Sequence, residues 1–169
     1  ILYGREGEGA FQILATQPGV EYAGNATPVF AAVGKPCPAL AFPNFGDHDY
    51  IKVRLDKTSL ASTVSGLSQV SDDLDRAMLW MTLWQMALDA EMSVPAYLEA
   101  VYKHLPRETN FQTLSKVLDT LAGRKLLSTS ALMYLDGQEE SLKTRYREAV
   151  TRLEALFWER MGASPPGSD

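Results

Sequence analysis

The spacing of hydrophobic residues changes near residue 56. Before this point, apolar residues fall in short β-prone runs at 11–15, 29–33 and 39–42, separated by Gly and Pro. After it, apolar residues recur every three or four positions almost to the C-terminus, which is the spacing of amphipathic helices. The pattern predicts a mainly α protein, with a β-rich segment at residues 1–56 and an α-helical domain at residues 57–169.

The clearest strand pattern covers residues 50–55, where apolar and polar side chains alternate. Successive side chains of a strand point to opposite faces, so one face should be buried and the other wetter. The apolar face carries Ile51, Val53 and Leu55. The wetter face carries Tyr50, Lys52 and Arg54.

The helical domain is predicted to contain helices joined by short loops. Their approximate ranges are 58–67, 71–89, 93–105, 111–122, 130–135 and 139–161. Short antiparallel helices connected in this way predict helical hairpins in a HEAT-like array, although no clear sequence repeat is present.

Capping residues mark the predicted helix boundaries. Asp56, Ser71 and Ser93 are expected N-caps, because their side-chain oxygens can accept hydrogen bonds from free backbone N–H groups. Gly123 is the expected C-cap, because glycine enters the left-handed conformation without a steric penalty. In the fourth helix, Phe111 is expected to point toward the core.

Charged residues add two expectations about helix faces. Asp75 and Arg76 belong to a narrow polar stripe on the second helix, which is otherwise apolar and therefore covered on most sides. In the last helix, Glu148 and Arg152 are spaced as a favourable i,i+4 ion pair.

Composition excludes several classes of function. The chain has 169 residues, a net charge of −5 and a sequence pI near 5.1, which argues against a general nucleic-acid-binding protein. Its one cysteine, Cys37, excludes an internal disulfide and a cysteine-based zinc site. No apolar stretch approaches the roughly 20 residues of a membrane span, and no signal-peptide pattern is visible, so a cytoplasmic location is predicted.

No catalytic or metal-binding pattern stands out. His48 and His104 lie in different predicted elements and lack metal-ligand spacing, and the His-Glu-x-x-His pattern is absent. Two interpretations of Asp47 and His48 are open: an acid/base pair, or a turn in which Asp47 and Asn44 bond backbone groups. The turn is favoured. On residues alone, the chain is interpreted as a scaffold or interaction module.

The stretch PNFGDHDYIKVRLD, residues 43–56, resembles a joint found in zinc aminopeptidases of the aminopeptidase N family. In that family the joint closes a small β-sandwich domain and leads into a large helical C-terminal domain. Asn44, Tyr50, Val53 and Asp56 match its skeleton.

Other segments carry the same resemblance. Ser59-Leu60-Ala61 follow the joint as in the bacterial branch, and the tryptophan-rich helix at 72–92 is similar as well. The resemblance covers most of residues 28–110.

The resemblance implies a non-catalytic portion of an enzyme that removes N-terminal residues from peptides. Zinc is then expected on an upstream catalytic domain of the same protein and not in this chain, whose helical domain encloses the peptide chamber. The structural residues of the joint would be Asn44, Asp47 and Asp56. The residues that could face the chamber are Tyr50, Lys52 and Arg54.

Two further expectations concern the ends of the chain. The first residue is Ile1 rather than Met, which predicts a piece of a longer protein. An incomplete helical array would expose apolar surface, so self-association through the last helix is expected. The alternative function is a stand-alone helical interaction module without enzymatic activity.

Overall fold

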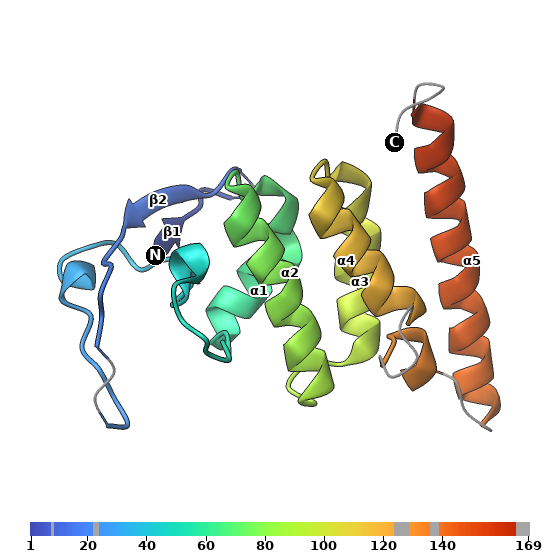
Figure 1. Cartoon of the computed structure of the whole chain (residues 1–169), viewed down its shortest axis with the longest axis horizontal. Helices are drawn as coiled ribbons and strands as arrows, with labels where there is room; N and C mark the ends of the chain where they lie inside the picture. The colour runs from blue at the N-terminus through green and yellow to red at the C-terminus, as the bar shows by residue number, and fades with distance from the viewer. Residues whose placement is uncertain (8, 22–23, 124–128, 136–138, 165–169) are drawn as a thin grey trace. The chain divides into compact units, whose positions relative to one another are not determined.

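The computed structural model of the chain describes residues 1–7, 9–21, 24–123, 129–135 and 139–164. It is mainly α-helical with a small sheet near the N-terminus, which confirms the predicted fold class (Figure 1). The strands are β1 (Leu2–Gly4), β2 (Gln12–Ala15) and β3 (Leu40–Ala41). The α-helices are α1 (Lys57–Gly66), α2 (Asp73–Leu88), α3 (Val94–His104), α4 (Phe111–Ala122) and α5 (Glu140–Ala163).

Contacts divide the chain into two compact units, Ile1–Leu83 and Trp84–Asp169, and the division falls within α2. The predicted division at residue 56 follows secondary structure instead, and as a domain boundary it stays a prediction. Each unit is described by itself below.

The first unit contains the antiparallel sheet, in the order β2-β1-β3. In β1, Tyr3 lies opposite Ile13 of β2 and Leu40 of β3. Tyr3 and Leu40 are buried, and α1 packs against β3. The core of this unit continues into α2 through Leu79, Trp80 and Leu83, which are buried.

The second unit contains the antiparallel hairpin of α3 and α4, followed by α5 (Figure 1). As predicted, Ser93 caps α3, where its hydroxyl accepts a hydrogen bond from the N–H of Ala96 at 3.3 Å. Gly123 ends α4 with φ 68° and ψ 50°, which confirms the predicted left-handed C-cap. Along α3, Tyr97, Leu98 and Val101 are buried.

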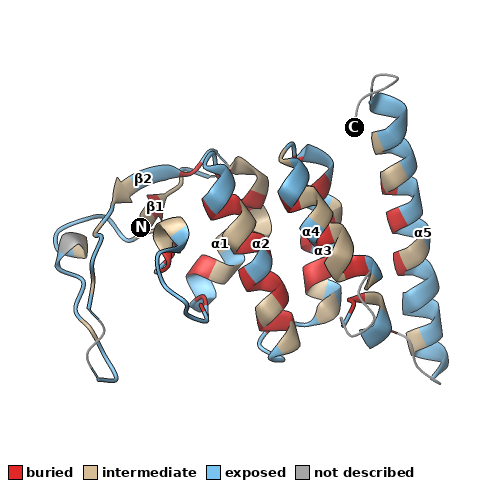
Figure 2. Ribbon diagram, in the orientation of Figure 1, coloured by how far each residue is buried: buried red, intermediate tan, exposed pale blue. Residues whose placement is uncertain are grey.

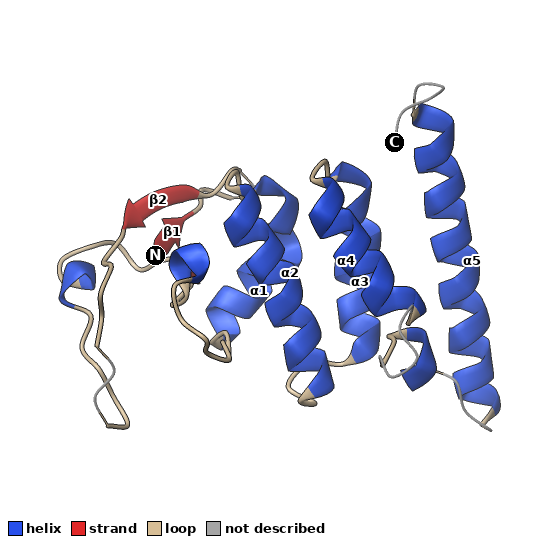
Figure 3. Cartoon of the chain, in the orientation of Figure 1, coloured by secondary structure: helices blue, strands red, loops and turns tan. Residues whose placement is uncertain are grey.

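The predicted strand at residues 50–55 is wrong, because this segment is a loop without strand pairing (Figure 3). The predicted facing is nevertheless present in part, since Val53 and Leu55 are buried. After this segment α1 packs against β3, and the N–H of Ala41 in β3 donates to the hydroxyl of Ser59 in α1 at 2.9 Å. The loop therefore follows the surface of the unit without adding to the sheet.

Two other predicted elements are shorter or of another type. Residues 29–33 form a 3-10 turn, η1 (Phe30–Ala32), where the N–H of Val33 donates to the carbonyl of Phe30 at 3.1 Å. The predicted helix at 130–135 is reduced to another 3-10 turn, η5 (Leu132–Tyr134). Both segments are too short for propensity alone to decide their backbone conformation.

Three predictions about helix faces and caps are corrected. Asp72, not Ser71, caps α2, because its carboxylate accepts a hydrogen bond from the N–H of Asp75 at 2.9 Å. Asp75 and Arg76, predicted to lie on the polar stripe of this helix, are buried, and polar partners inside the first unit offset the cost of their burial. Phe111 is 68% exposed, because it is the first residue of α4 and lies at the edge of the hairpin.

Candidate functional site

The segment between β3 and α1, residues 43–56, is called the joint segment from here on. Asn44 closes its first turn: the side-chain amide donates to the carbonyl of Asp49 at 3.0 Å and accepts from the N–H of Asp49 at 3.2 Å. Asn44 is buried, so these bonds also satisfy polar atoms that water does not reach. A single side chain therefore holds a loop of six residues in one conformation.

Asp47 and His48 lie in this turn and are exposed. Asp47 adopts the left-handed conformation, with φ 54°, and its carboxylate accepts a bond from the Asn44 amide at 3.3 Å. The His48 ring folds back over Gly46: a Cβ added at Gly46 would lie 2.8 Å from its Nε2 atom. Asn44 thus bonds backbone groups as the turn interpretation expects, whereas the Asp47 carboxylate bonds the Asn44 side chain. The geometry gives no support to an acid/base pair.

Asp56 connects the joint segment to α1. Its Oδ1 atom accepts hydrogen bonds from the N–H groups of Thr58 and Ser59 at 2.8 and 3.1 Å, which makes it the N-cap of the helix. Its Oδ2 atom accepts a bond from the Ser59 hydroxyl at 2.5 Å. Because that hydroxyl also accepts from the N–H of Ala41, Ser59 links β3, the joint segment and α1.

The hydrogen bond from the Ser59 hydroxyl is the main cause that lowers the pKa of Asp56 below its usual range. The N–H groups of Thr58 and Ser59 act in the same direction, because they stabilise the ionised carboxylate. Asp56 is therefore negatively charged at neutral pH. The positive end of the α1 dipole favours this charge.

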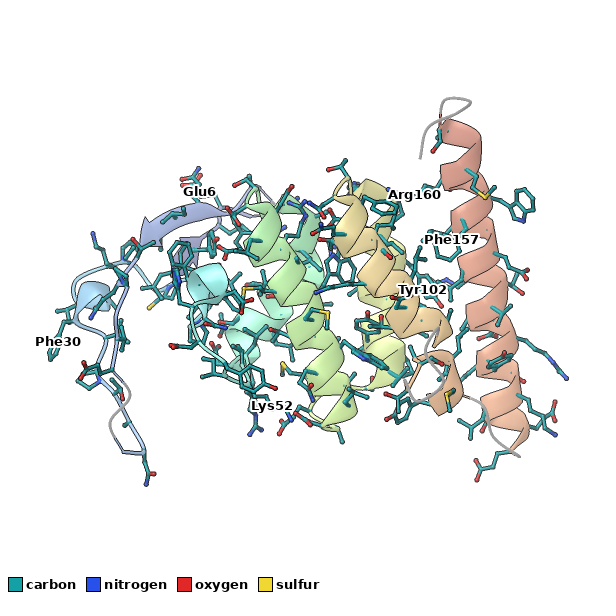
Figure 4. All side chains as sticks on the ribbon, viewed as in Figure 1. Glu6, Phe30, Lys52, Tyr102, Phe157 and Arg160 are labelled. Carbon is teal, nitrogen blue, oxygen red and sulfur yellow. The ribbon has the colours of Figure 1, made fainter. Side chains whose placement is uncertain are left out.

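The outer face of the joint segment carries the predicted chamber residues. Tyr50, Lys52 and Arg54 are exposed, while Val53 and Leu55 point into the first unit and are buried. The structure thus brings the three side chains to one exposed segment, of which Lys52 is labelled in Figure 4. None of them belongs to a strand. Of the two residues between them, Val53 is buried, whereas Ile51 is exposed.

A largely apolar pocket of about 310 Å³ lies beside this segment in the first unit. Its polar boundary includes Arg54 and Asp56. Its apolar lining includes Leu2, Ala15, Val20, Val29, Ala41, Phe42 and Pro43. The pocket connects the joint segment with all three strands, although neither its lining nor its volume specifies a ligand.

In the second unit, charged side chains gather between α3 and α5. Arg152 of α5 forms a two-pronged ion pair with Glu99 of α3, with N–O distances of 2.5 and 3.2 Å. Its guanidinium carbon lies 3.7 Å from the centre of the Tyr102 ring, in a cation–π contact. The sequence predicts Glu148 as the partner of Arg152, but the observed pair joins residues 53 positions apart.

Arg160 makes the second polar contact between these helices. It donates to the carbonyls of Leu105, Pro106 and Glu108, at 2.9, 3.2 and 2.5 Å. These carbonyls end α3 and the following 3-10 turn, η4 (Leu105–Arg107), where helical carbonyls lack partners of their own. Arg160 and Tyr102 are labelled in Figure 4 and lie on the facing sides of α5 and α3.

Sequence reasoning missed both of these contacts, and it also missed the role of Ser59. Nothing in the local spacing marks Arg160, because its acceptors are backbone atoms more than 50 residues earlier. For Ser59, its position three residues after the capping Asp56 is a usable signal, since a side chain there can reach the cap.

No metal site is evident in the part of the chain that the structure describes, where no three His, Cys, Asp or Glu residues gather closely enough to hold an ion. His104, for example, is buried within α3, while His48 is exposed in the joint segment. Among the described helices, none has the length and apolar character needed to cross a membrane.

Comparison with known proteins gives two matches. The model of the family described as the ERAP1-like C-terminal domain matches residues 40–169. The Aminopeptidase N of Streptomyces lividans is 32% identical over 130 residues, which make up 75% of this chain but 14% of that protein. No solved structure matches the chain significantly.

The family match begins at β3, and it includes the joint segment and the described helices α1 to α5. It covers well over half of the chain, and the identity to the Streptomyces protein extends over three quarters of it. The chain therefore belongs to the aminopeptidase N family and carries its ERAP1-like C-terminal domain.

Proposed function

We propose that the chain is the non-catalytic C-terminal portion of a zinc-dependent aminopeptidase, in which it acts as the scaffold that encloses the peptide chamber. The observation that carries this proposal is the family match over residues 40–169. The likeness to Aminopeptidase N supports the assignment to a peptidase, of which this chain corresponds to a small part. The partner of the chain is then the upstream catalytic domain of the same protein.

The joint segment has properties that suit a connection between domains. Asn44 and Asp56 fix its two ends by hydrogen bonds to backbone groups, and Ser59 attaches it to β3. A segment held in this way keeps α1 in a fixed position relative to the sheet, within the first unit, without a flexible linker. In the proposed function it orients the helical domain relative to the chamber.

Zinc belongs to the catalytic domain in this proposal. The described residues of this chain offer no set of three ligands, so no catalytic step is assigned to them. The contribution of the chain is to limit the peptides that reach the chamber. Tyr50, Lys52 and Arg54 are the side chains proposed to face it.

The proposal is tested by comparing this chain with the full-length protein that contains it. Both are assayed for hydrolysis of leucine p-nitroanilide, and their zinc content is measured by inductively coupled plasma mass spectrometry. We expect hydrolysis and stoichiometric zinc in the full-length protein, and neither in the 169-residue chain. Hydrolysis by the chain alone, abolished by His48→Ala or Asp47→Ala, would contradict the proposal.

The chamber-facing residues need a second experiment on the full-length protein. Lys52→Met and Arg54→Met remove positive charge while they keep much of the apolar stem. If these residues face the chamber, kcat/KM for acidic peptides falls while kcat/KM for leucine p-nitroanilide stays unchanged. Lys57→Met, at the first residue of α1, is the matched control, since it removes a nearby exposed positive charge. Equal effects of all three changes would reject the assignment.

The alternative, a stand-alone interaction module, is not favoured by these matches. The proposal includes no nucleic-acid and no membrane partner. A cytoplasmic location stays a prediction, which fractionation of the source cells tests.

A further inference from the structure

Few residues of α5 are fully buried against the rest of the second unit for the length of the helix. Of its 24 residues, the buried ones are Ala149, Leu153 and Leu156. In contrast, α3 buries five of its 11 residues. Figure 2 shows α5 as largely exposed along its length. Because hydrophobic stabilisation scales with the apolar area removed from water, α5 is weakly held by this term.

The two arginines described above lie at the edges of this small apolar contact. Ala149, Leu153, Leu156 and Arg160 follow the four-three-four spacing of one helix face, and Arg152 lies next to it. Arg152 contacts the middle of α3, whereas Arg160 contacts its C-terminal end. Since both sets of contacts advance together along the two chains, α5 runs parallel to α3.

The contacts of Arg152 and Arg160 differ in how strongly they depend on ionic strength. The Arg152 and Glu99 side chains are 51% and 60% exposed, so dissolved salt screens their attraction. Arg160 is half-buried and bonds neutral carbonyls, so its contact depends on geometry more than on ionic strength. The contact of Arg152 is therefore more sensitive to salt than the contact of Arg160.

We propose that Arg152 and Arg160 form a latch that holds α5 on α3, and that α5 separates from α3 as one unit while α3 and α4 stay packed. Separation uncovers Leu153 and Leu156 together with the facing side of α3. The ionic strength sets how often this happens, through the pair of Arg152 and Glu99. This inference does not depend on the proposed function.

The hairpin of α3 and α4 has the contacts needed to remain folded without α5. The hydroxyls of Tyr97 in α3 and Thr120 in α4 are hydrogen-bonded at 2.9 Å. Val101 of α3 and Val117 of α4 are both buried. These contacts lie within the hairpin itself, so the proposal expects them to persist when α5 separates.

Hydrogen exchange of the complete chain, followed by mass spectrometry, tests the proposal. Amide exchange is measured for peptides from α5 and α4 in about 0.05 M and about 0.5 M NaCl, which changes the Debye length from roughly 14 to 4 Å. We expect exchange in α5 to rise several-fold with salt relative to α4. Equal protection of α5 and α4 at both salt concentrations would overturn the proposal.

Two substitutions distinguish the contribution of the Arg152 contact from that of the Arg160 contact. Glu99→Gln removes the ion pair, and we expect it to raise exchange in α5 and to abolish most of the salt effect. Arg160→Met is expected to raise exchange in α5 and at residues 105–108 at both salt concentrations. Arg147→Met is the matched control, because Arg147 is exposed and its ion pair, with Glu140 at 3.8 Å, lies within α5.

Amide exchange in α4 is the internal reference for every variant. If exchange in α4 rises as much as in α5, the second unit opens as a whole and the latch is rejected. If Arg147→Met has the same effect as Arg160→Met, the charge of α5 rather than the latch holds the helix, and the proposal again fails.

Discussion

The hydroxyl of Tyr3 in β1 donates a hydrogen bond to the carboxylate of Asp75 in α2, 72 residues later in the chain. Both side chains are buried, and only 1% of Asp75 is exposed. The other carboxylate oxygen, Oδ1, has no hydrogen-bond partner within the described residues. The Tyr3 hydroxyl is thus the side-chain group that compensates the burial of this carboxylate, and it ties the sheet to α2 within the first unit.

Tyr3→Phe should therefore be destabilising although it removes only one oxygen atom. It leaves both carboxylate oxygens of Asp75 without a side-chain donor, which costs about 1–3 kcal/mol of unfolding free energy. Urea unfolding followed by circular dichroism measures this change. Tyr50→Phe is the control, because Tyr50 is fully exposed and its change should stay within about 0.5 kcal/mol. Equal effects of the two substitutions would show that the hydrogen bond adds no stability.

The Asp56 cap should make α1 sensitive to acid. Asp56→Ala removes the acceptor for two N–H groups and should cost about 1 kcal/mol at neutral pH, whereas Asp56→Asn retains an acceptor and should cost less.

The pKa of Asp56 is lowered in the folded chain, so its ionised form stabilises the fold above the unfolded pKa of about 3.9. This contribution is lost as the pH falls through the lower, folded pKa. Thermal unfolding at several pH values should thus show the difference between wild type and Asp56→Asn shrink in acid. A difference that is constant from pH 7 to acid would contradict the role of the charge.

Local signals in the sequence predict much of the helical part. Asp56, Ser93 and Gly123 cap the helices that they were expected to cap, because a cap depends on residues only two to four positions away. The joint segment is recognisable for a related reason, since its turn and its cap are built from neighbouring residues.

Contacts between distant segments escape the same analysis. The alternation at residues 50–55 predicts buried and exposed faces, but it does not reveal whether a partner strand exists. Likewise, the interior position of Asp75 depends on Tyr3, and the partner of Arg152 is Glu99 on another helix. In each case an apolar or charged pattern is compatible with several partners, and packing decides among them.

The ends of α2 and α4 offer a matched test of backbone strain. Ala90, just after α2, has φ 59°, and Gly123, just after α4, has φ 68°. A side chain is disfavoured in this left-handed region, whereas glycine enters it freely. Ala90→Gly should raise the unfolding free energy by about 0.5 kcal/mol, and Gly123→Ala should lower it by about 1 kcal/mol. Chemical denaturation measures both, and changes of the same sign would reject the explanation.

The exposed apolar residues of α5 favour self-association. Trp158 and Met161 are 72% and 65% exposed and lie three positions apart on one side of the helix. We expect weak dimers of the chain at high concentration, and a monomer after Trp158→Glu. Light scattering coupled to size-exclusion chromatography measures the mass. Phe111→Glu, at an exposed apolar position of α4, is the control and should leave the dimer intact. A wild-type chain that stays monomeric would contradict this expectation.

The buried hydroxyl of Tyr97 should make the second unit sensitive to alkali. Burial raises the pKa of Tyr97 from 10.0 to about 12, since the phenolate is costly away from water. The folded state therefore holds this proton while the unfolded state releases it near pH 10, and stability falls as the pH rises from about 10 to about 12.

Tyr97→Phe should flatten this alkaline decline, at the cost of the hydrogen bond to Thr120 at neutral pH. Urea unfolding at several alkaline pH values measures the slope. The absorbance of ionised tyrosine near 295 nm should show that one fewer tyrosine titrates near pH 12 in the Tyr97→Phe variant. Thr120→Val is the control, because it removes the hydrogen-bond partner and leaves the buried phenol that titrates. If Thr120→Val flattens the decline as much as Tyr97→Phe does, the hydrogen bond rather than the burial of Tyr97 causes the alkaline loss of stability.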